Sequence, residues 1–81
     1  MATPAREKVF RIVSGVLDCP REQVDEDTSP DTAKNWDSLR HMKLMMALEE
    51  ELGVQFTADQ IVEMNSVGLI LAVLEETGAL R

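Results

Sequence analysis

Ser38 and His41 form the first pair of side chains in this sequence that could do chemistry together. Residues three apart on a helix are neighbours, so the histidine could serve as a base toward the serine hydroxyl. No further residue nearby is placed to orient the histidine, and no glycine-flanked turn surrounds the serine. The pattern therefore favours a partly buried histidine near a helix end over a hydrolase, and we expect no catalytic residue.

Acidic and hydroxyl side chains alternate through residues 25–31, a spacing that calcium-binding loops share. Counted from Asp25, however, the sixth position is Pro30 instead of glycine and the twelfth is Trp36 instead of glutamate. A single histidine and a single cysteine also cannot build a zinc site. We therefore expect a solvated acidic loop and no bound metal.

The charges of residues 37–53 (DSLRHMKLMMALEEELG) run against the dipole of the helix that this segment predicts. Arg40, His41 and Lys43 lie in its N-terminal half, whereas three glutamates end it. A helix N-terminus carries partial positive charge and favours acids. A phosphate on Ser38 would restore consistency, because free amides and nearby bases favour an anion there. A helix held by ordinary salt bridges is the alternative explanation.

Four helices are expected to position these groups. Residues 4–18 carry apolar side chains at spacings of three and four, with Thr3 as the cap and Pro20 just beyond the end. Residues 20–35 form a long loop with one short turn near Val24. Asp37 caps a helix over 38–52, and Gly53 ends it.

The last third of the chain predicts two more helices. Thr57 and Gln60 form a capping box that begins a short helix reaching about residue 64. Ser66 caps the final helix, which is apolar nearly all round and ends at Gly78. Together these elements predict an all-α, four-helix bundle with three longer helices and one short one.

The helix over 38–52 has two apolar faces. One face should enter the core, with His41 at its N-terminal end, and consists of His41, Leu44, Met45, Leu48 and Leu52. The opposite stripe consists of Leu39, Met42 and Met46. A single small domain need not bury both faces, so this second stripe is a candidate surface for partners.

Composition narrows the class of protein further. The chain has 81 residues, which suffices for one domain over 1–81, and 44% apolar and 28% charged residues, as in globular proteins. A net charge of −7 repels phosphate backbones and anionic lipids, so we expect no nucleic-acid binding. No apolar stretch approaches the roughly 20 residues that span a bilayer, so we expect no stable membrane insertion.

The cellular compartment is predicted from cysteine usage and from the N-terminus. Cys19 is the one cysteine, which excludes an internal disulfide and fits a reducing compartment. The first 20 residues contain no continuous apolar segment of the kind found in secretory signals. We therefore expect a cytoplasmic protein. Separately, we expect a monomer.

The Asp37-Ser38-Leu39 triplet, the apolar-periodic helix through MALEEELG and the capped short helix that follows resemble acyl carrier proteins and related phosphopantetheine-binding carriers. The resemblance covers essentially the whole chain. It implies that Ser38 receives 4′-phosphopantetheine from coenzyme A through a phosphopantetheinyl transferase. Asp37 and Leu39 would flank this cofactor, and Asp37 would help the transferase hold Mg²⁺.

The resemblance also implies a function and a set of partners. The distal thiol of the cofactor would carry an acyl or aminoacyl group between a loading ligase and downstream transferases or synthases, as in fatty-acid or polyketide biosynthesis. The carrier itself would not be an enzyme. Its surface for these enzymes would consist of Leu39, Arg40, Met42, Lys43, Met46, Glu49 and Glu50. His41 and Met45 would lie at the mouth of an interior pocket for the acyl chain.

Several residues depart from the pattern of fatty-acid carriers, in which acids are common at the start of this helix. Arg40 and Lys43 stand there instead, and Trp36 precedes the triplet where a small residue is usual. Gly68 and Ala72 add to the apolar surface expected of the last helix. These departures favour a specialised pathway over the housekeeping one. A D-alanyl or peptidyl type of amino-acid carrier, and an unmodified helical adaptor, are the alternatives.

Overall fold

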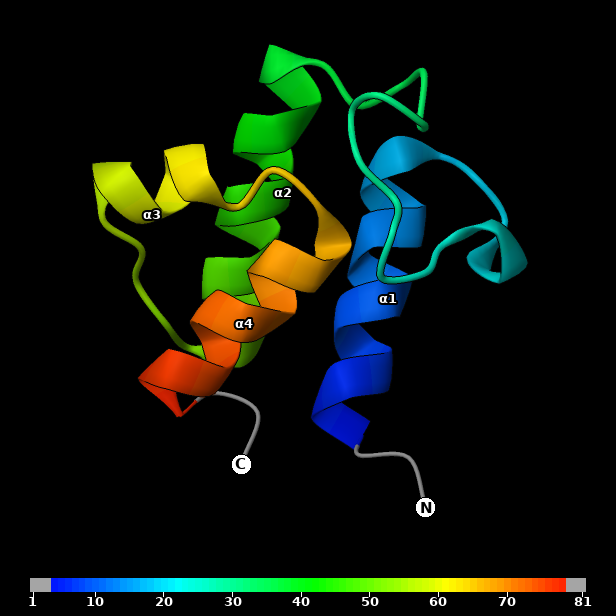
Figure 1. Ribbon diagram of the computed structural model, residues 1–81. Helices are drawn as coiled ribbons and strands as arrows, with labels where there is room; N and C mark the ends of the chain where they lie inside the picture. The colour runs from blue at the N-terminus through cyan, green and yellow to red at the C-terminus, as the bar shows by residue number, and fades with distance from the viewer. Residues whose placement is uncertain (1–3, 79–81) are drawn as a thin grey trace.

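The structure, a computed structural model, describes residues 4–78 as four α-helices and one short 3-10 turn (Figure 1). The elements are α1 (Pro4–Leu17), η1 (Arg21–Gln23), α2 (Ser38–Leu52), α3 (Ala58–Glu63) and α4 (Val67–Thr77). No strand occurs within this range. The predicted four-helix bundle with one short helix is therefore confirmed. The predicted cap at Thr3 lies outside the described residues.

Helices α1 and α2 lie side by side and antiparallel, and α4 packs across them (Figure 1). Lys8, near the start of α1, binds Glu51 at the end of α2. At the opposite end of the pair, Arg40 reaches the carbonyl of Val16. The C-terminus of α1 thus lies beside the N-terminus of α2, where the candidate serine is found.

The core lies between α1, α2 and α4 and is almost entirely aliphatic. Its most deeply buried side chains are Leu17, Leu44, Met45, Leu48, Met64, Ile70, Leu74, Val9, Val13 and Val67. The predicted inner face of α2 is confirmed, with Leu52 partly buried at its end. Phe10 is also buried, on the same face of α1 as Val13 and Leu17, which lie three and seven residues further along.

The helix ends follow the local sequence signals. Thr57 and Gln60 form both bonds of a capping box, and Ser66 accepts a bond from the amide of Leu69. Gly53 and Gly78 end α2 and α4 in the left-handed conformation. These caps confirm the predicted starts and stops of three helices.

The first helix ends at Leu17, next to the predicted end at residue 18, through a motif that the sequence did not indicate. Asp18 adopts the left-handed conformation, with φ of 54°, and the amide of Cys19 then donates to the carbonyl of Ser14 at 3.1 Å. This bond closes a Schellman motif, in which aspartate replaces the usual glycine. Pro20 lies two residues beyond and continues the extended chain.

The long loop is ordered by its own polar side chains. The Asp25 carboxylate accepts from the amide of Asp27, and the Thr28 hydroxyl accepts from the amide of Asp25, both at 2.9 Å. In a second turn, the Thr32 hydroxyl accepts from the amide of Ser29, and the amide of Thr32 donates to the carbonyl of Ser29. Such turns give a polar segment a fixed shape without a helix or strand.

This loop is also tied to the first turn of α4. The amides of Val67 and Gly68 donate to the carbonyls of Thr28 and Glu26, each at 2.9 Å. A side chain at position 68 would place its Cβ 3.1 Å from the Glu26 oxygen, which is tighter than ordinary contact. Gly68 therefore serves a close approach of loop and helix, and the expectation that it adds exposed apolar surface is wrong. Ala72 is exposed as expected.

Glu7 and Arg21 form a two-pronged ion pair that holds η1 against α1. The Arg21 guanidinium donates twice to the carboxylate at 2.7 Å, and it lies over the Phe10 ring at 4.5 Å from the centroid. The hydrogen bond from Arg21 holds the pKa of Glu7 below its ordinary value of 4.5, against the opposing effect of desolvation. The same bond raises the pKa of Arg21.

This pair predicts an acid-dependent contribution to stability. A carboxylate with a lowered pKa stabilises the folded protein above pH 4.5, and that contribution is lost as the pH falls through the folded value. Glu7→Gln should therefore lower the urea midpoint at pH 7, and the gap to wild type should close in acid. Glu63→Gln, at an exposed residue of α3, is the matched control and should produce no such gap. A gap for Glu7→Gln that stays constant down to strong acid would contradict this assignment.

Candidate functional site

Ser38 is the first residue of α2 and is exposed. The preceding residue, Asp37, provides the cap: its carboxylate accepts from the amide of Arg40 at 2.8 Å, and its carbonyl accepts from the amide of His41. The Ser38 hydroxyl is therefore not needed for capping, and it makes no hydrogen bond to any residue in 4–78. It lies at the positive end of the helix dipole, ahead of the first intrahelical bonds, where an attached phosphate would be favoured.

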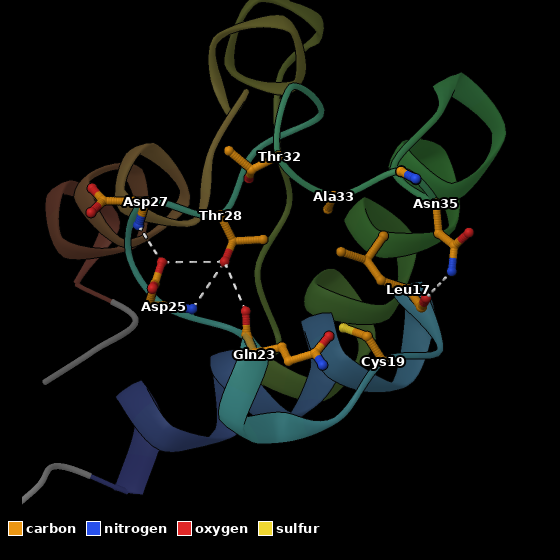
Figure 2. Close-up of a pocket in the computed structure, with 10 residues that line it drawn as sticks. Leu17, Cys19, Gln23, Asp25, Asp27, Thr28, Thr32, Ala33 and Asn35 are labelled. Atoms are coloured by element: carbon orange, nitrogen blue, oxygen red, sulfur yellow. Dashed lines mark hydrogen bonds between the residues drawn. The ribbon is translucent and has the colours of Figure 1, made fainter.

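Two side chains hold the serine segment against the end of α1. Asn35 Nδ2 donates to the carbonyl of Leu17 at 2.8 Å, as the dashed line in Figure 2 shows. Arg40 donates through its guanidinium to the carbonyl of Val16 at 2.6 Å. The chain is thus anchored both before and after Ser38.

Trp36 and His41 form a third attachment of the chain around the serine. The indole of Trp36 is only 4% exposed, and its Nε1–H donates to His41 Nδ1 at 2.9 Å. Since Nδ1 accepts this bond, Nε2 carries the ring proton and donates to the carbonyl of Ile61 at 2.8 Å. The chain Trp36–His41–Ile61 therefore connects the loop, α2 and α3.

These bonds exclude His41 as a base for Ser38. Both ring nitrogens are occupied by other groups, one by the indole and one by a backbone carbonyl. The histidine is half-buried and serves the fold, as the non-catalytic interpretation of the sequence predicted.

The second apolar stripe of α2 is exposed as predicted. Leu39 is 65% exposed, Met42 48% and Met46 64%, while Lys43 and Glu50 are exposed beside them. Exposing three large apolar side chains on one helix gives the domain no stability, so this surface is suited to contact with other proteins. Methionine side chains repack easily and suit a surface that meets several enzymes.

Two residues predicted to meet partners are engaged inside the molecule. Arg40 is half-buried and bound to α1, and the Glu49 carboxylate accepts from the amide of Phe56 at 2.9 Å. The sequence could not indicate either bond, because each of these side chains binds a backbone group: Arg40 binds a carbonyl, and Glu49 binds an amide. Of the charged residues predicted to meet partners, Lys43 and Glu50 are therefore the two that are exposed.

A pocket of about 550 Å³ lies between the long loop and the end of α1 (Figure 2). Cys19, Thr28 and Asn35 are among the residues that line it. His41 and Met45, the predicted mouth of an acyl pocket, do not line it. Met45 is only 1% exposed within the core, so an acyl chain entering there would have to displace it. An interior acyl pocket remains a prediction.

Comparison with known proteins identifies the family. Residues 7–74 match the family model described as the phosphopantetheine attachment site. The chain belongs to this family. The fold is similar to the solution structure of a holo acyl carrier protein from Geobacter metallireducens, with a TM-score of 0.80, 25% identity, and coverage of 94% of this chain and 87% of that one. No curated protein sequence matches this chain.

Membership establishes the general function of the chain. It is an acyl-carrier-type protein that bears covalent 4′-phosphopantetheine and works with phosphopantetheinyl transferase and pathway enzymes, without catalysing a reaction itself. When attached, the cofactor supplies a thiol that forms thioesters. The exposed, unengaged hydroxyl of Ser38 fits the attachment of such a group. Of the helices in residues 4–78, none is long and apolar enough to cross a membrane.

The buried contacts of His41 predict a measurable cost for its removal. His41→Ala would leave the indole N–H of Trp36 without its acceptor, which should lower the free energy of unfolding by about 1–3 kcal/mol. Urea unfolding followed by the fluorescence of Trp36, the one tryptophan, measures this change. Met42→Ala, on the exposed side of the same helix turn, should change stability by no more than about 0.5 kcal/mol. Equal losses in the two variants would argue against a structural role for His41.

Proposed function

We propose that Ser38 is the attachment residue for 4′-phosphopantetheine and that the chain carries a thioester-bound acyl group for a specialised pathway. The observation that carries this proposal is the exposed Ser38 hydroxyl at the start of α2, left free because Asp37 caps the helix. Family membership identifies the cofactor as 4′-phosphopantetheine, and Ser38 lies within the residues that match the family model.

The attachment is a phosphoryl-group transfer in which coenzyme A is the co-reactant. The Ser38 oxygen bonds to the phosphorus that bears the pantetheine arm, and the pyrophosphate bond of coenzyme A breaks. Adenosine 3′,5′-bisphosphate leaves, and the serine proton passes to a base on the transferase. Within this chain, Asp37 keeps the helix start in place, and the dipole of α2 favours the phosphodiester that results.

The surface proposed for partner enzymes consists of Leu39, Met42, Lys43, Met46 and Glu50. All five side chains are exposed on α2 within about three and a half turns of Ser38. No acidic residue lies in the first turn of this helix, and Lys43 is its exposed cation. Partners should therefore offer an apolar recess together with an acidic group, unlike enzymes whose basic patches meet acidic carriers.

The bonds of Trp36 bear on the choice of cargo. Trp36 departs from the residue usual in fatty-acid carriers, but its burial and its bond to His41 give it a structural role within this domain. Trp36 therefore gives no support to an amino-acid cargo, and our proposal is an acyl cargo. The single, half-buried Cys19 cannot form an internal disulfide and supports our proposal of a cytoplasmic protein.

Attachment at Ser38 is tested by incubating the full chain with coenzyme A and a permissive phosphopantetheinyl transferase. Intact-mass measurement should show one added phosphopantetheine on the wild type and none on Ser38→Ala. Ser29→Ala, which changes a serine in the loop, is the matched control and should still be modified. No adduct on the wild type, or an adduct that persists in Ser38→Ala, would sink the proposal.

The role of Lys43 is tested by reversing its charge. Lys43→Glu should weaken acceptance by the native loading enzyme by about 5-fold, because a surface ion pair contributes up to roughly 1 kcal/mol. The same variant should improve acceptance by fatty-acid synthase enzymes. Steady-state kcat/KM for each enzyme is the measurement, with Lys34→Glu in the loop as the control for net charge. Identical kinetics for Lys43→Glu and wild type would remove Lys43 from the partner surface.

A further inference from the structure

We propose that Asn35 and Arg40 are positioning residues for the modification of Ser38. Asn35 lies three residues before the serine and Arg40 two residues after it. Each donates a hydrogen bond to the C-terminal end of α1. The inference rests on the proposed function of Ser38 and adds a reason why its hydroxyl would be presented in one fixed place.

The two acceptors are the consecutive carbonyls of Val16 and Leu17. The last carbonyls of a helix have no intrahelical donor, so they are available to side chains from elsewhere. They also carry the negative end of the helix dipole, which favours a guanidinium such as that of Arg40. The bonds from Arg40, at 2.6 Å, and from Asn35, at 2.8 Å, therefore satisfy two carbonyls that have no donor within α1.

The end of α1 is itself a fixed reference point. Val13 and Leu17 are fully packed in the core, and the amide of Cys19 closes the Schellman bond to Ser14. The Ser14 hydroxyl donates in return to the carbonyl of Cys19 at 2.7 Å. Asn35 and Arg40 thus connect an exposed helix start to one of the most constrained parts of the molecule.

The remaining contacts near Ser38 account for folding without these two side chains. Trp36 is buried, and Asp37 caps α2. The loss of Asn35 or Arg40 should therefore leave the helices intact and loosen only the short segment around the serine. A group transfer requires its reacting atoms to be aligned, and a displacement of about 1 Å can cost about 100-fold in rate.

A loosened serine should affect the chemical step more than enzyme docking. The exposed stripe of α2, which we propose as the surface for enzymes, does not include Asn35, and the Arg40 guanidinium is bound to α1. Removing the two donors should therefore lower kcat of the transferase while its KM for the carrier stays unchanged. A purely structural role would instead lower stability and leave kcat of the folded protein at its wild-type value.

The experiment compares full-length Asn35→Ala, Arg40→Met and the double variant in transferase assays with coenzyme A. We expect kcat to fall at least about 10-fold in the double variant, with smaller losses in the single variants. Arg40→Lys keeps a cationic donor and should recover much of the rate that Arg40→Met loses. Lys34→Met is the control, because it removes a neighbouring exposed cation with no hydrogen bond to α1 among the described residues. Amide exchange over residues 36–40 should quicken in the variants that lose kcat.

Each outcome bears on a specific claim. A wild-type kcat in the folded double variant would overturn the positioning role, as would equal rates for Arg40→Lys and Arg40→Met. If the double variant fails to fold, the Arg40→Lys and Arg40→Met pair decides the question. Ser38→Ala is assayed in parallel: modification of that variant would defeat the proposed attachment residue, whereas a normal rate in the Asn35 and Arg40 variants would defeat only the inference made here.

Discussion

The antiparallel contact of α1 with α2 is the constraint on which the rest of the structure depends. It places the C-terminus of α1, with its open carbonyls, beside the N-terminus of α2, with its open amides. Side chains at the start of α2 can then satisfy the end of α1, and Lys8 does the converse by donating to the carbonyl of Glu51. Ends that lie this close could be joined by a short connection. The long loop instead extends to the first turn of α4, where the carbonyls of Thr28 and Glu26 accept from Val67 and Gly68, before it returns to the start of α2.

The reversed charges of α2 have a different explanation once its neighbour is considered. Alone, cations at the start of a helix and acids at its end oppose the dipole. In an antiparallel pair, the same cations lie beside the negative end of α1 and the same acids beside its positive end. Arg40 binds the Val16 carbonyl at the end of α1, and Glu51 binds Lys8 near its start. Lys43 and Glu50, by contrast, face the surface. The pattern attributed to a site therefore serves helix pairing in part, and only its exposed members bear on partner recognition.

The features predicted from sequence are those that depend on near neighbours in the chain. Helix caps such as Thr57 with Gln60, and the two faces of α2, arise within a few residues and leave a readable pattern. Several of the unpredicted contacts at the site join distant residues through a backbone atom. Arg40 and Val16 are 24 positions apart, and His41 and Ile61 are 20 apart. A backbone carbonyl is present at every position, so no residue type marks which one will be used.

A carrier must keep one hydroxyl accessible to enzymes while holding it still, and these needs conflict on a small domain. Accessibility requires an exposed helix start, where few apolar contacts restrain the chain. This fold separates the two tasks: Ser38 and the stripe beside it stay exposed, while Asn35, Trp36 and Arg40 secure the flanking chain from the inner side. Each of these three bonds ends on α1 or on a half-buried residue of α2. The rigidity of the site is therefore derived from the core, and the surface that meets enzymes is left free to adapt.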